Sequence, residues 1–300
     1  MKQKCIYAKM HDEVENSRKA LLKKANATIG DIVRLFPNAD TEVVELNDLS
    51  ISNKTAIVLL GLSVTGKTTF ANMLKKQNDF LTIVSMDDCA RRLYQFGIMD
   101  EELNNTASVQ VFGEQLEHYS KINQPIIVDG LWVNIYSRIA LFKTLRKIGY
   151  EICVIDFITN YDSEAHKDKM MKRALDLLAW KRLIEIDNIK FVNQADSVYD
   201  NATMILATRL GITEYKLIER LMQEDEYVDI LSNVYNDSVN EVNDNLVSMQ
   251  KSYDLFKIGA DLLVTFWISF PMKEGLISSL FLHFLPKSGI IYMWLIILGG

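Results

Sequence analysis

Glycine, lysine and threonine residues follow an apolar run at fixed spacing near residue 60. Gly61, Gly66, Lys67 and Thr68 fit the pattern G-x-x-x-x-G-K-[ST]. Gly61 can turn the chain, and Gly66 lets successive backbone N–H groups approach a phosphate. Lys67 supplies a positive charge for β- and γ-phosphates, and Thr68 offers a hydroxyl to Mg²⁺. We therefore predict a nucleotide-binding loop made of Gly61, Ser63, Val64, Thr65, Gly66, Lys67, Thr68 and Thr69.

Carboxylates end the next two apolar runs. Asp87 and Asp88 follow "LTIVS", and Asp129 ends "PIIVD". We expect Asp87 to face the site as a proton acceptor and Asp88 to cap the following helix. We expect Asp129 to hold Mg²⁺ together with Thr68. Motor ATPases usually place a glutamate after this aspartate, whereas here Gly130 follows, so the pattern favours transfer to a bound acceptor.

Short apolar runs alternate with helical stretches through the middle of the chain. This alternation predicts a parallel sheet covered by helices on both faces. The strands that we expect are residues 56–61, 81–85, 125–130, 150–158 and 196–201. Because the carboxyl ends of parallel strands share one edge, the loop and both aspartates should meet there.

The flanking segments differ in composition from this domain at residues 55–206. Residues 1–54 have helical spacing and predict an N-terminal helical extension, and residues 207–254 predict an acidic helical region. Residues 255–300 are hydrophobic, but lysine and proline divide them into pieces shorter than the roughly 20 residues of a spanning helix. We expect this segment to pack on the chain or on a protein partner, with membrane association as the alternative.

Bulk composition narrows the function classes. A net charge of −6 does not favour nucleic-acid binding, although a local basic patch stays possible. The three cysteines are scattered and the four histidines lack metal-ligand spacing, so we expect a reduced, cytoplasmic protein without a disulfide framework. The polar start does not resemble a signal peptide.

Residues 55–201 resemble the P-loop kinase superfamily. They are most similar to the branch of phage polynucleotide kinase and the zeta-toxin-like kinases. The resemblance is carried by the loop at 61–68, "MDDCARR", "IIVDGLWVNIYSRIALFKTLRKIGY" and "ADSVYDN". It implies a three-layer α/β sandwich with a five-stranded parallel sheet in the order 2-3-1-4-5, plus helical extensions. It also implies ATP as the nucleotide.

The resemblance also implies roles for single residues. Asp87 would be the general base, Arg91 or Arg92 would bind the acceptor's phosphate or the transferred group, and Arg138 would lie near the acceptor pocket. The family's arginine after the paired aspartates falls nearest to Ala90, so Arg91 fits only with a shifted helix start. Gly130-Leu131-Trp132 replaces the usual polar residues, which argues against a polynucleotide acceptor.

A basic helical stretch follows the fourth expected strand, where kinases carry a lid. Lid cations neutralise charge that develops on the γ-phosphate. The candidates are Lys172, Arg173, Lys181 and Arg182, of which we favour Arg173 as a catalytic residue beside Lys67 and Asp87. The alternative is a solvated helix with pairs four residues apart, such as Asp168–Lys172.

These features predict an ATP- and Mg²⁺-dependent kinase that phosphorylates a hydroxyl of a small molecule, a nucleotide sugar or a nucleic-acid end. The alternative is a nucleotide-gated module that acts on a protein or membrane partner through its C-terminal region. A third interpretation is an inactive protein with a decayed C-terminus. Asp87→Asn separates the first two, because only a kinase needs this carboxylate for turnover.

Overall fold

The computed structural model describes residues 4–24, 27–44, 49–61, 64–96, 98, 101–132, 134–159, 164–187, 201–239, 259–268, 281–287 and 290–296. The helices are α1 (Ile6–Leu22), α2 (Ile29–Val33), α3 (Lys67–Gln77), α4 (Met86–Gln95), α5 (Glu101–Lys121), α6 (Ile135–Lys147), α7 (Glu164–Asp187), α9 (Ala202–Leu210), α10 (Glu214–Leu221) and α11 (Asp225–Val239). The strands are β1 (Glu42–Val43), β2 (Thr55–Leu60), β3 (Thr82–Ser85), β4 (Ile126–Asp129), β5 (Glu151–Thr159), β6 (Leu262–Ile268), β7 (Phe281–Lys287) and β8 (Ile290–Ile296).

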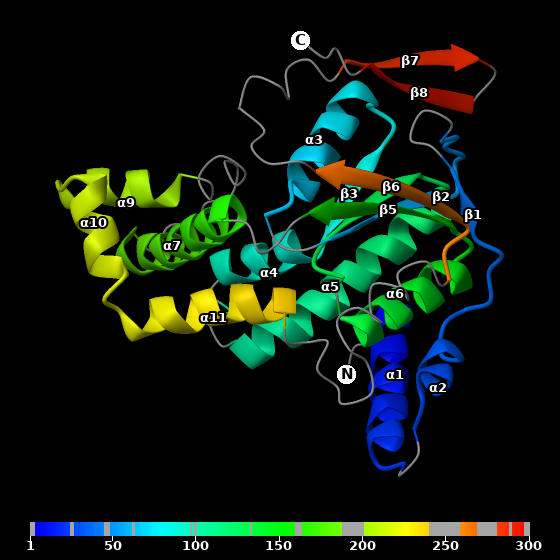
Figure 1. Cartoon of the computed structure of the whole chain (residues 1–300), viewed down its shortest axis with the longest axis horizontal. Helices are drawn as coiled ribbons and strands as arrows, with labels where there is room; N and C mark the ends of the chain where they lie inside the picture. The colour runs from blue at the N-terminus through cyan, green and yellow to red at the C-terminus, as the bar shows by residue number, and fades with distance from the viewer. Residues whose placement is uncertain are drawn as a thin grey trace.

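A parallel sheet lies at the centre of the molecule, with strand order β1-β6-β5-β2-β4-β3 (Figure 1). The first four expected strands correspond to β2, β3, β4 and β5. From β3 to β6 the order matches the predicted 2-3-1-4-5. The short strand β1 adds a sixth member at the β6 edge, and the predicted α/β class is confirmed.

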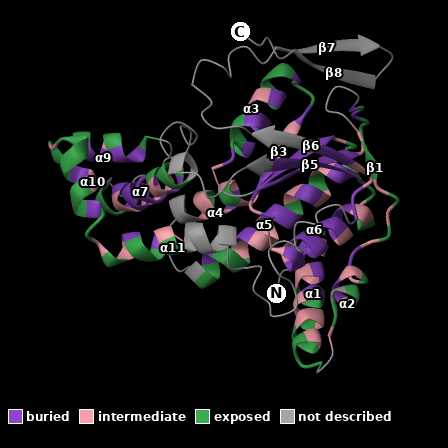
Figure 2. Cartoon of the chain, viewed as in Figure 1, coloured by how far each residue is buried: buried purple, intermediate pink, exposed green. Residues whose placement is uncertain are grey.

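The side chains of the central strand β2 point alternately into two cores, one on each face of the sheet, and this explains the three layers of helices, sheet and helices. Ala56, Val58 and Leu60 belong to the core that includes α1, α5 and α6, whereas Ile57 and Leu59 belong to the core with α3. All six residues of β2 are buried, because side chains one residue apart point to opposite, covered faces. Figure 2 shows this buried interior across the strands.

The fifth strand is not the one predicted. Of residues 196–201, only Asn201 is described, and it lies in a turn before α9. The position beside β5 belongs to β6, which comes from the segment predicted to lie outside the domain. Asp261 fixes its start, because its carboxylate accepts hydrogen bonds from the Ile152 N–H at 2.7 Å and from Arg146 at 2.5 Å.

The N-terminal extension is helical, as predicted, and it is part of the main core. Helix α1 packs on α5 and α6, with Tyr7 edge-on to Phe112 at a ring separation of 5.1 Å. Two N–H groups at its start donate to α5, from Cys5 to Gln110 and from Ile6 to Glu117. These contacts satisfy donors that a helix start leaves unpaired.

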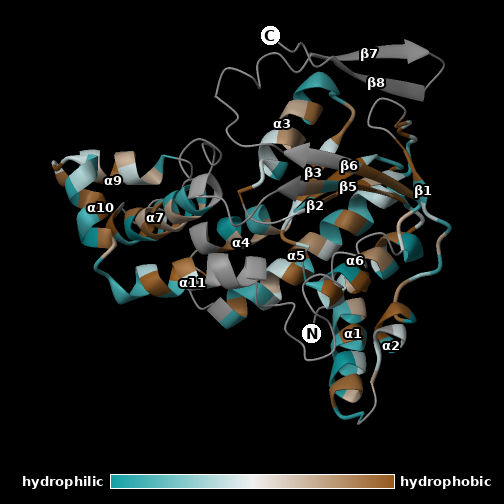
Figure 3. Ribbon diagram, in the orientation of Figure 1, coloured by the Kyte–Doolittle hydropathy of each residue, from teal (hydrophilic) through white to brown (hydrophobic). Residues whose placement is uncertain are grey.

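Helices α7, α9, α10 and α11 form a separate group beside the sheet (Figure 1). They share an apolar core, which includes Leu178, Leu183, Leu206, Leu217 and Tyr227. Figure 3 shows hydrophobic and hydrophilic residues interspersed along these helices, as expected of amphipathic elements. We call this group the helical subdomain. In the sequence it is inserted between β5 and β6, which are neighbours in the sheet.

Strands β7 and β8 pair antiparallel in a small second sheet. In the part of the chain that the structure describes, no helix is both long enough and apolar enough to cross a bilayer.

Candidate active site

The glycine-framed loop joins the end of β2 to the start of α3. Gly61 has a φ of 139°, Val64 a φ of 56° and Gly66 a φ of 87°, so the loop uses backbone conformations that side chains rarely allow. Gly61 is enclosed, because an added Cβ would lie 2.8 Å from the carbonyl oxygen of Phe157 on β5. Leu62 and Ser63 lie outside the described residues, so the role predicted for Ser63 in nucleotide binding stays a prediction.

Lys67 is the first residue of α3 and its side chain is buried. Its Nζ donates to the carbonyl oxygen of Gly61 at 2.8 Å and to Thr65 Oγ1 at 3.5 Å, so the ammonium lies across its own loop. Burial lowers the pKa of Lys67 to about 8, against the opposing charges of Asp129 and Asp87. A buried cation at a helix N-terminus is suited to bind an anion.

Thr68 and Asp129 connect α3 to the end of β4. Thr68 Oγ1 donates to Asp129 Oδ2 at 2.8 Å, and Asp129 is only 4% exposed. Burial raises the pKa of Asp129, while the Thr68 hydrogen bond lowers it. A hydroxyl and a carboxylate are both oxygen ligands of the kind that Mg²⁺ takes, so this pair fits the predicted metal site.

Asp87 lies in the first turn of α4, which begins directly after β3. Its side chain is exposed. Burial lowers the pKa of Lys67 and raises that of Asp129, and the negative charge of Asp87 opposes the first effect and adds to the second. The pairing of Ser85 with Asp129 aligns the ends of β3 and β4 at the same edge of the sheet. Asp87 is thus within electrostatic reach of the lysine and the aspartate that frame the loop.

The residue that caps the N-terminus of α4 is Ser85, and not Asp88 as was expected. Ser85 Oγ accepts the Asp88 N–H at 3.3 Å, so Ser85 holds the first turn in the way that Asp88 was expected to. Asp88 instead forms an ion pair with Arg91, three residues later on the same helix. Sequence reasoning missed Ser85, although a serine before a helix is an N-cap signal.

The arginines predicted to bind the acceptor have different environments. Arg91 is engaged by Asp88 and its side chain is 16% exposed, whereas Arg92 is exposed. Arg138 is fully buried, and its Nη1 donates to the Trp132 carbonyl oxygen at 3.3 Å. Its helix is covered by the sheet on one side and by α1 on the other, so Arg138 lies in the core, and its role in acceptor binding stays a prediction.

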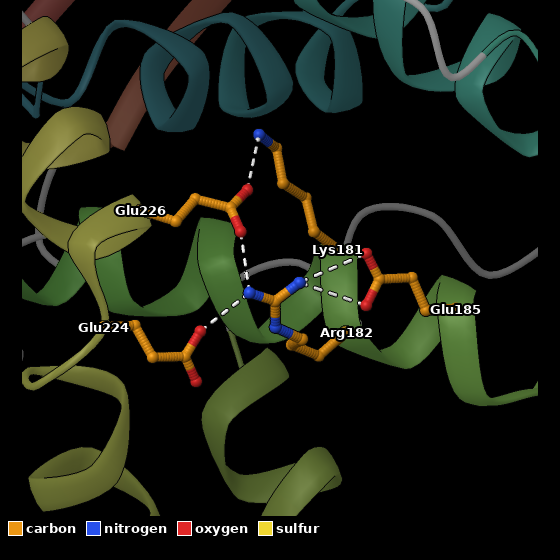
Figure 4. Close-up of polar contacts among 5 residues, drawn as sticks. All are labelled: Lys181, Arg182, Glu185, Glu224 and Glu226. Carbon is orange, nitrogen blue, oxygen red and sulfur yellow. Dashed lines mark hydrogen bonds and ion pairs between the residues drawn. The ribbon is translucent and has the colours of Figure 1, made fainter.

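The four basic lid candidates on α7 also have different environments. The positive charge of Arg173 contributes to the lowered pKa of Lys67, so Arg173 lies within electrostatic reach of the loop. Lys172 is exposed. Lys181 and Arg182 instead form ion pairs with glutamates around the start of α11 (Figure 4). The predicted lid role therefore does not apply to these two residues, because carboxylates of the subdomain already engage them.

Comparison with known protein families gives a match over this part of the chain. Residues 57–176 match the family model described as an AAA domain, and these residues include the loop, Asp87, Asp129 and Arg173. No curated protein matches the sequence significantly.

Two solved structures show weak similarity to this chain. One is a presumed kinase from Chloroflexus aurantiacus, with 12% identity, 57% of this chain and 98% of that chain covered, and a TM-score of 0.35. The other comes from the PezAT chromosomal toxin–antitoxin system of Streptococcus pneumoniae, with 18% identity, 56% and 67% coverage, and a TM-score of 0.30. At these TM-scores the likeness carries no information on function.

Proposed function

We propose that the protein is a Mg²⁺- and ATP-dependent phosphotransferase that moves the γ-phosphate to a hydroxyl of a small molecule, a nucleotide sugar or a nucleic-acid end. The observation that carries this proposal is the position of Asp87, two residues after Ser85, which ends β3 and pairs with Asp129 at the end of β4. A carboxylate opposite a phosphate loop is suited to accept the proton of an attacking hydroxyl.

Each residue near the loop has a role in this reaction. The loop amides and Lys67 would bind the terminal phosphates, and Thr68 with Asp129 would hold Mg²⁺. Bound there, Mg²⁺ supplies positive charge that neutralises the phosphate oxygens. Asp87 would take the hydroxyl proton as the acceptor oxygen bonds to phosphorus and the bond to the leaving diphosphate breaks.

Cations complete the proposed site. Arg173 would stabilise the charge that develops on the transferred group, because its charge already acts on Lys67. Arg91 and Arg92, one turn along α4 from Asp87, would bind an anionic group of the acceptor. The ion pair between Asp88 and Arg91 would orient the Arg91 guanidinium.

Asp87→Asn tests the proposal. We expect unchanged affinity for the magnesium complex of ATP and a loss of transfer of about 10²- to 10⁴-fold, the usual contribution of a general base. The assay is incubation with labelled ATP and an extract of metabolites and oligonucleotides, with mass spectrometry for a product that gains one phosphate.

Two variants control this experiment. Lys67→Ala should lose both nucleotide binding and transfer, whereas Asp40→Asn, at an exposed carboxylate outside the site, should keep the proton acceptor and most of the rate. If Asp87→Asn transfers phosphate like the original protein, the kinase assignment fails. Nucleotide binding with no transfer by either protein would favour the nucleotide-gated module.

A further inference from the structure

A charged cluster joins two helices of the helical subdomain (Figure 4). Arg182 Nη2 lies 2.7 Å from a carboxylate oxygen of Glu224 and 2.7 Å from one of Glu226. Its Nη1 donates to both oxygens of Glu185, at 3.1 and 3.0 Å, and Lys181 adds a pair with Glu226 at 3.2 Å. Both terminal nitrogens of the Arg182 guanidinium are therefore engaged.

The pairs to Glu224 and Glu226 connect distant parts of the chain. Arg182 is on α7, Glu224 directly precedes α11, and Glu226 lies in its first turn. Glutamate is favoured at a helix N-terminus by the helix dipole, so the acidic partners suit that end of α11. Glu185 is on α7 itself, so its pair with Arg182 joins no second helix.

The Arg182 guanidinium forms directional hydrogen bonds, which apolar packing between α7 and α11 does not provide. The shared core of the subdomain holds α7 against α11, but apolar attraction has no preferred direction. A planar fork with fixed hydrogen-bond directions allows fewer rotations of α7 about its axis. Each side chain in the cluster is about one-third exposed or more, so a single pair contributes little and the effect depends on the network.

Arg173 precedes Arg182 by nine residues on the same helix. Nine residues correspond to about 13.5 Å along the axis and about half a turn around it. The two side chains therefore leave α7 in nearly opposite directions, with Arg182 at the start of α11. Helix α7 begins five residues after β5, and Asp156 of β5 pairs with Leu60 directly before the phosphate loop, so the half of α7 that carries Arg173 follows the edge of the sheet where the loop lies. Because a helix is rigid over this length, fixing the Arg182 side also fixes the direction of Arg173.

We propose that Arg182 is a positioning residue, which orients α7 through Glu224 and Glu226 so that Arg173 faces the γ-phosphate. This role rests on the proposed function, in which Arg173 contacts that phosphate. It predicts that loss of the fork weakens interactions with the γ-phosphate and leaves those with the α- and β-phosphates unchanged.

The test compares the affinity for a non-hydrolysable ATP analogue with that for ADP, both with Mg²⁺, by titration calorimetry. Arg182→Met should weaken analogue binding about 5- to 10-fold without changing ADP binding, and it should lower kcat about 10- to 100-fold, as expected of a displaced catalytic group. The double variant Glu224→Gln/Glu226→Gln should show the same loss of analogue affinity and of kcat as Arg182→Met. Glu185→Gln is the matched control and should retain the original analogue-to-ADP ratio.

A double-mutant cycle with Arg173→Met decides whether the effect passes through Arg173. Once Arg173 is absent, Arg182→Met should cause no further loss of analogue affinity or kcat. An equal loss in both backgrounds, or parallel weakening of ADP binding, would overturn the proposal.

Two further measurements keep the test independent of folding and of the kinase assignment. Arg182→Lys retains charge and most of the side chain, so it should fold and still show reduced discrimination; discrimination equal to the original protein would contradict the role of the fork. Absence of transfer with every acceptor would reject the proposed function, while the analogue-to-ADP ratio would still decide the role of Arg182.

Discussion

Thr68 Oγ1 donates a hydrogen bond to Asp129 Oδ2 at 2.8 Å, and this contact joins the first turn of α3 to the end of β4. Asp129 is buried, so its carboxylate is kept where a second oxygen ligand is already in place. The relationship is local in space but spans 61 residues of chain. It brings the two halves of the proposed metal site together.

Removal of either partner should weaken the response of nucleotide binding to magnesium. We expect Thr68→Val and Asp129→Asn to raise the Mg²⁺ concentration needed for half-maximal ATP binding by about 10- to 100-fold, the scale seen when groups around a metal are removed. ATP affinity without Mg²⁺ should change little in Thr68→Val. Calorimetric titrations over a series of Mg²⁺ concentrations measure this, with Asp88→Asn as the carboxylate control; equal magnesium dependence in all variants would refute the assignment.

Nucleotide affinity should depend on pH through Lys67. Burial lowers its pKa to about 8 in the ligand-free protein. A bound polyphosphate favours the charged ammonium, so binding above pH 8 must be accompanied by proton uptake. We expect ATP affinity to fall as pH rises above about 8, and calorimetry in buffers of different ionisation enthalpy should detect the proton.

The same group affects stability in the opposite direction. Because unfolding restores a pKa near 10.5, the unfolded chain binds more protons between pH 8 and 10.5, and the Lys67 contribution to stability rises across this window. Lys67→Met should remove both pH dependences. A Lys67→Met protein that still shows the change in stability or in proton uptake would assign these effects to another group.

The two glycines of the loop should respond differently to alanine. At Gly66 the cost is conformational, about 1–2 kcal/mol, because φ is 87° and no atom lies within 4 Å of an added Cβ. At Gly61 the added Cβ would also lie 2.8 Å from the Phe157 carbonyl oxygen. Gly61→Ala should therefore destabilise the protein more in urea unfolding and weaken ATP binding more than Gly66→Ala; the reverse order would be inconsistent with this geometry.

Asp261 should stabilise the edge of the sheet. Its carboxylate accepts from Arg146 and from the Ile152 N–H, and Asp261→Ala leaves both donors without this partner. We expect a loss of about 1–3 kcal/mol in the free energy of unfolding, the usual range for hydrogen bonds to a charged group. Urea unfolding measures it, with the exposed Asp40→Ala as control, for which we expect a change below about 0.5 kcal/mol.

Local patterns in the sequence were sufficient for the centre of the fold. Four strands and the glycine-framed loop depend on apolar runs, turn residues and the strand–loop–helix sequence around Gly61 and Lys67, which are all short-range properties. The order of the strands was instead implied by the resemblance to the P-loop kinases. The carboxylates Asp87 and Asp129 could be proposed because they follow strands directly. Parallel strands then place them at one edge.

Only the tertiary structure decided the features that depend on distant segments. The partner of β5 is β6, about 100 residues further along the chain, and an apolar run does not specify which strand it pairs with. Lys172, Arg173, Lys181 and Arg182 were all lid candidates in the sequence, with Arg173 favoured, and only the packing of α7 showed that Arg182 pairs with Glu224. The resemblance placed Arg138 near the acceptor pocket, but only the packing of α1 and the sheet around α6 showed that its side chain is buried. In each case, periodicity specifies that a residue lies on a helix or strand, but the elements that cover each face are determined by the whole chain.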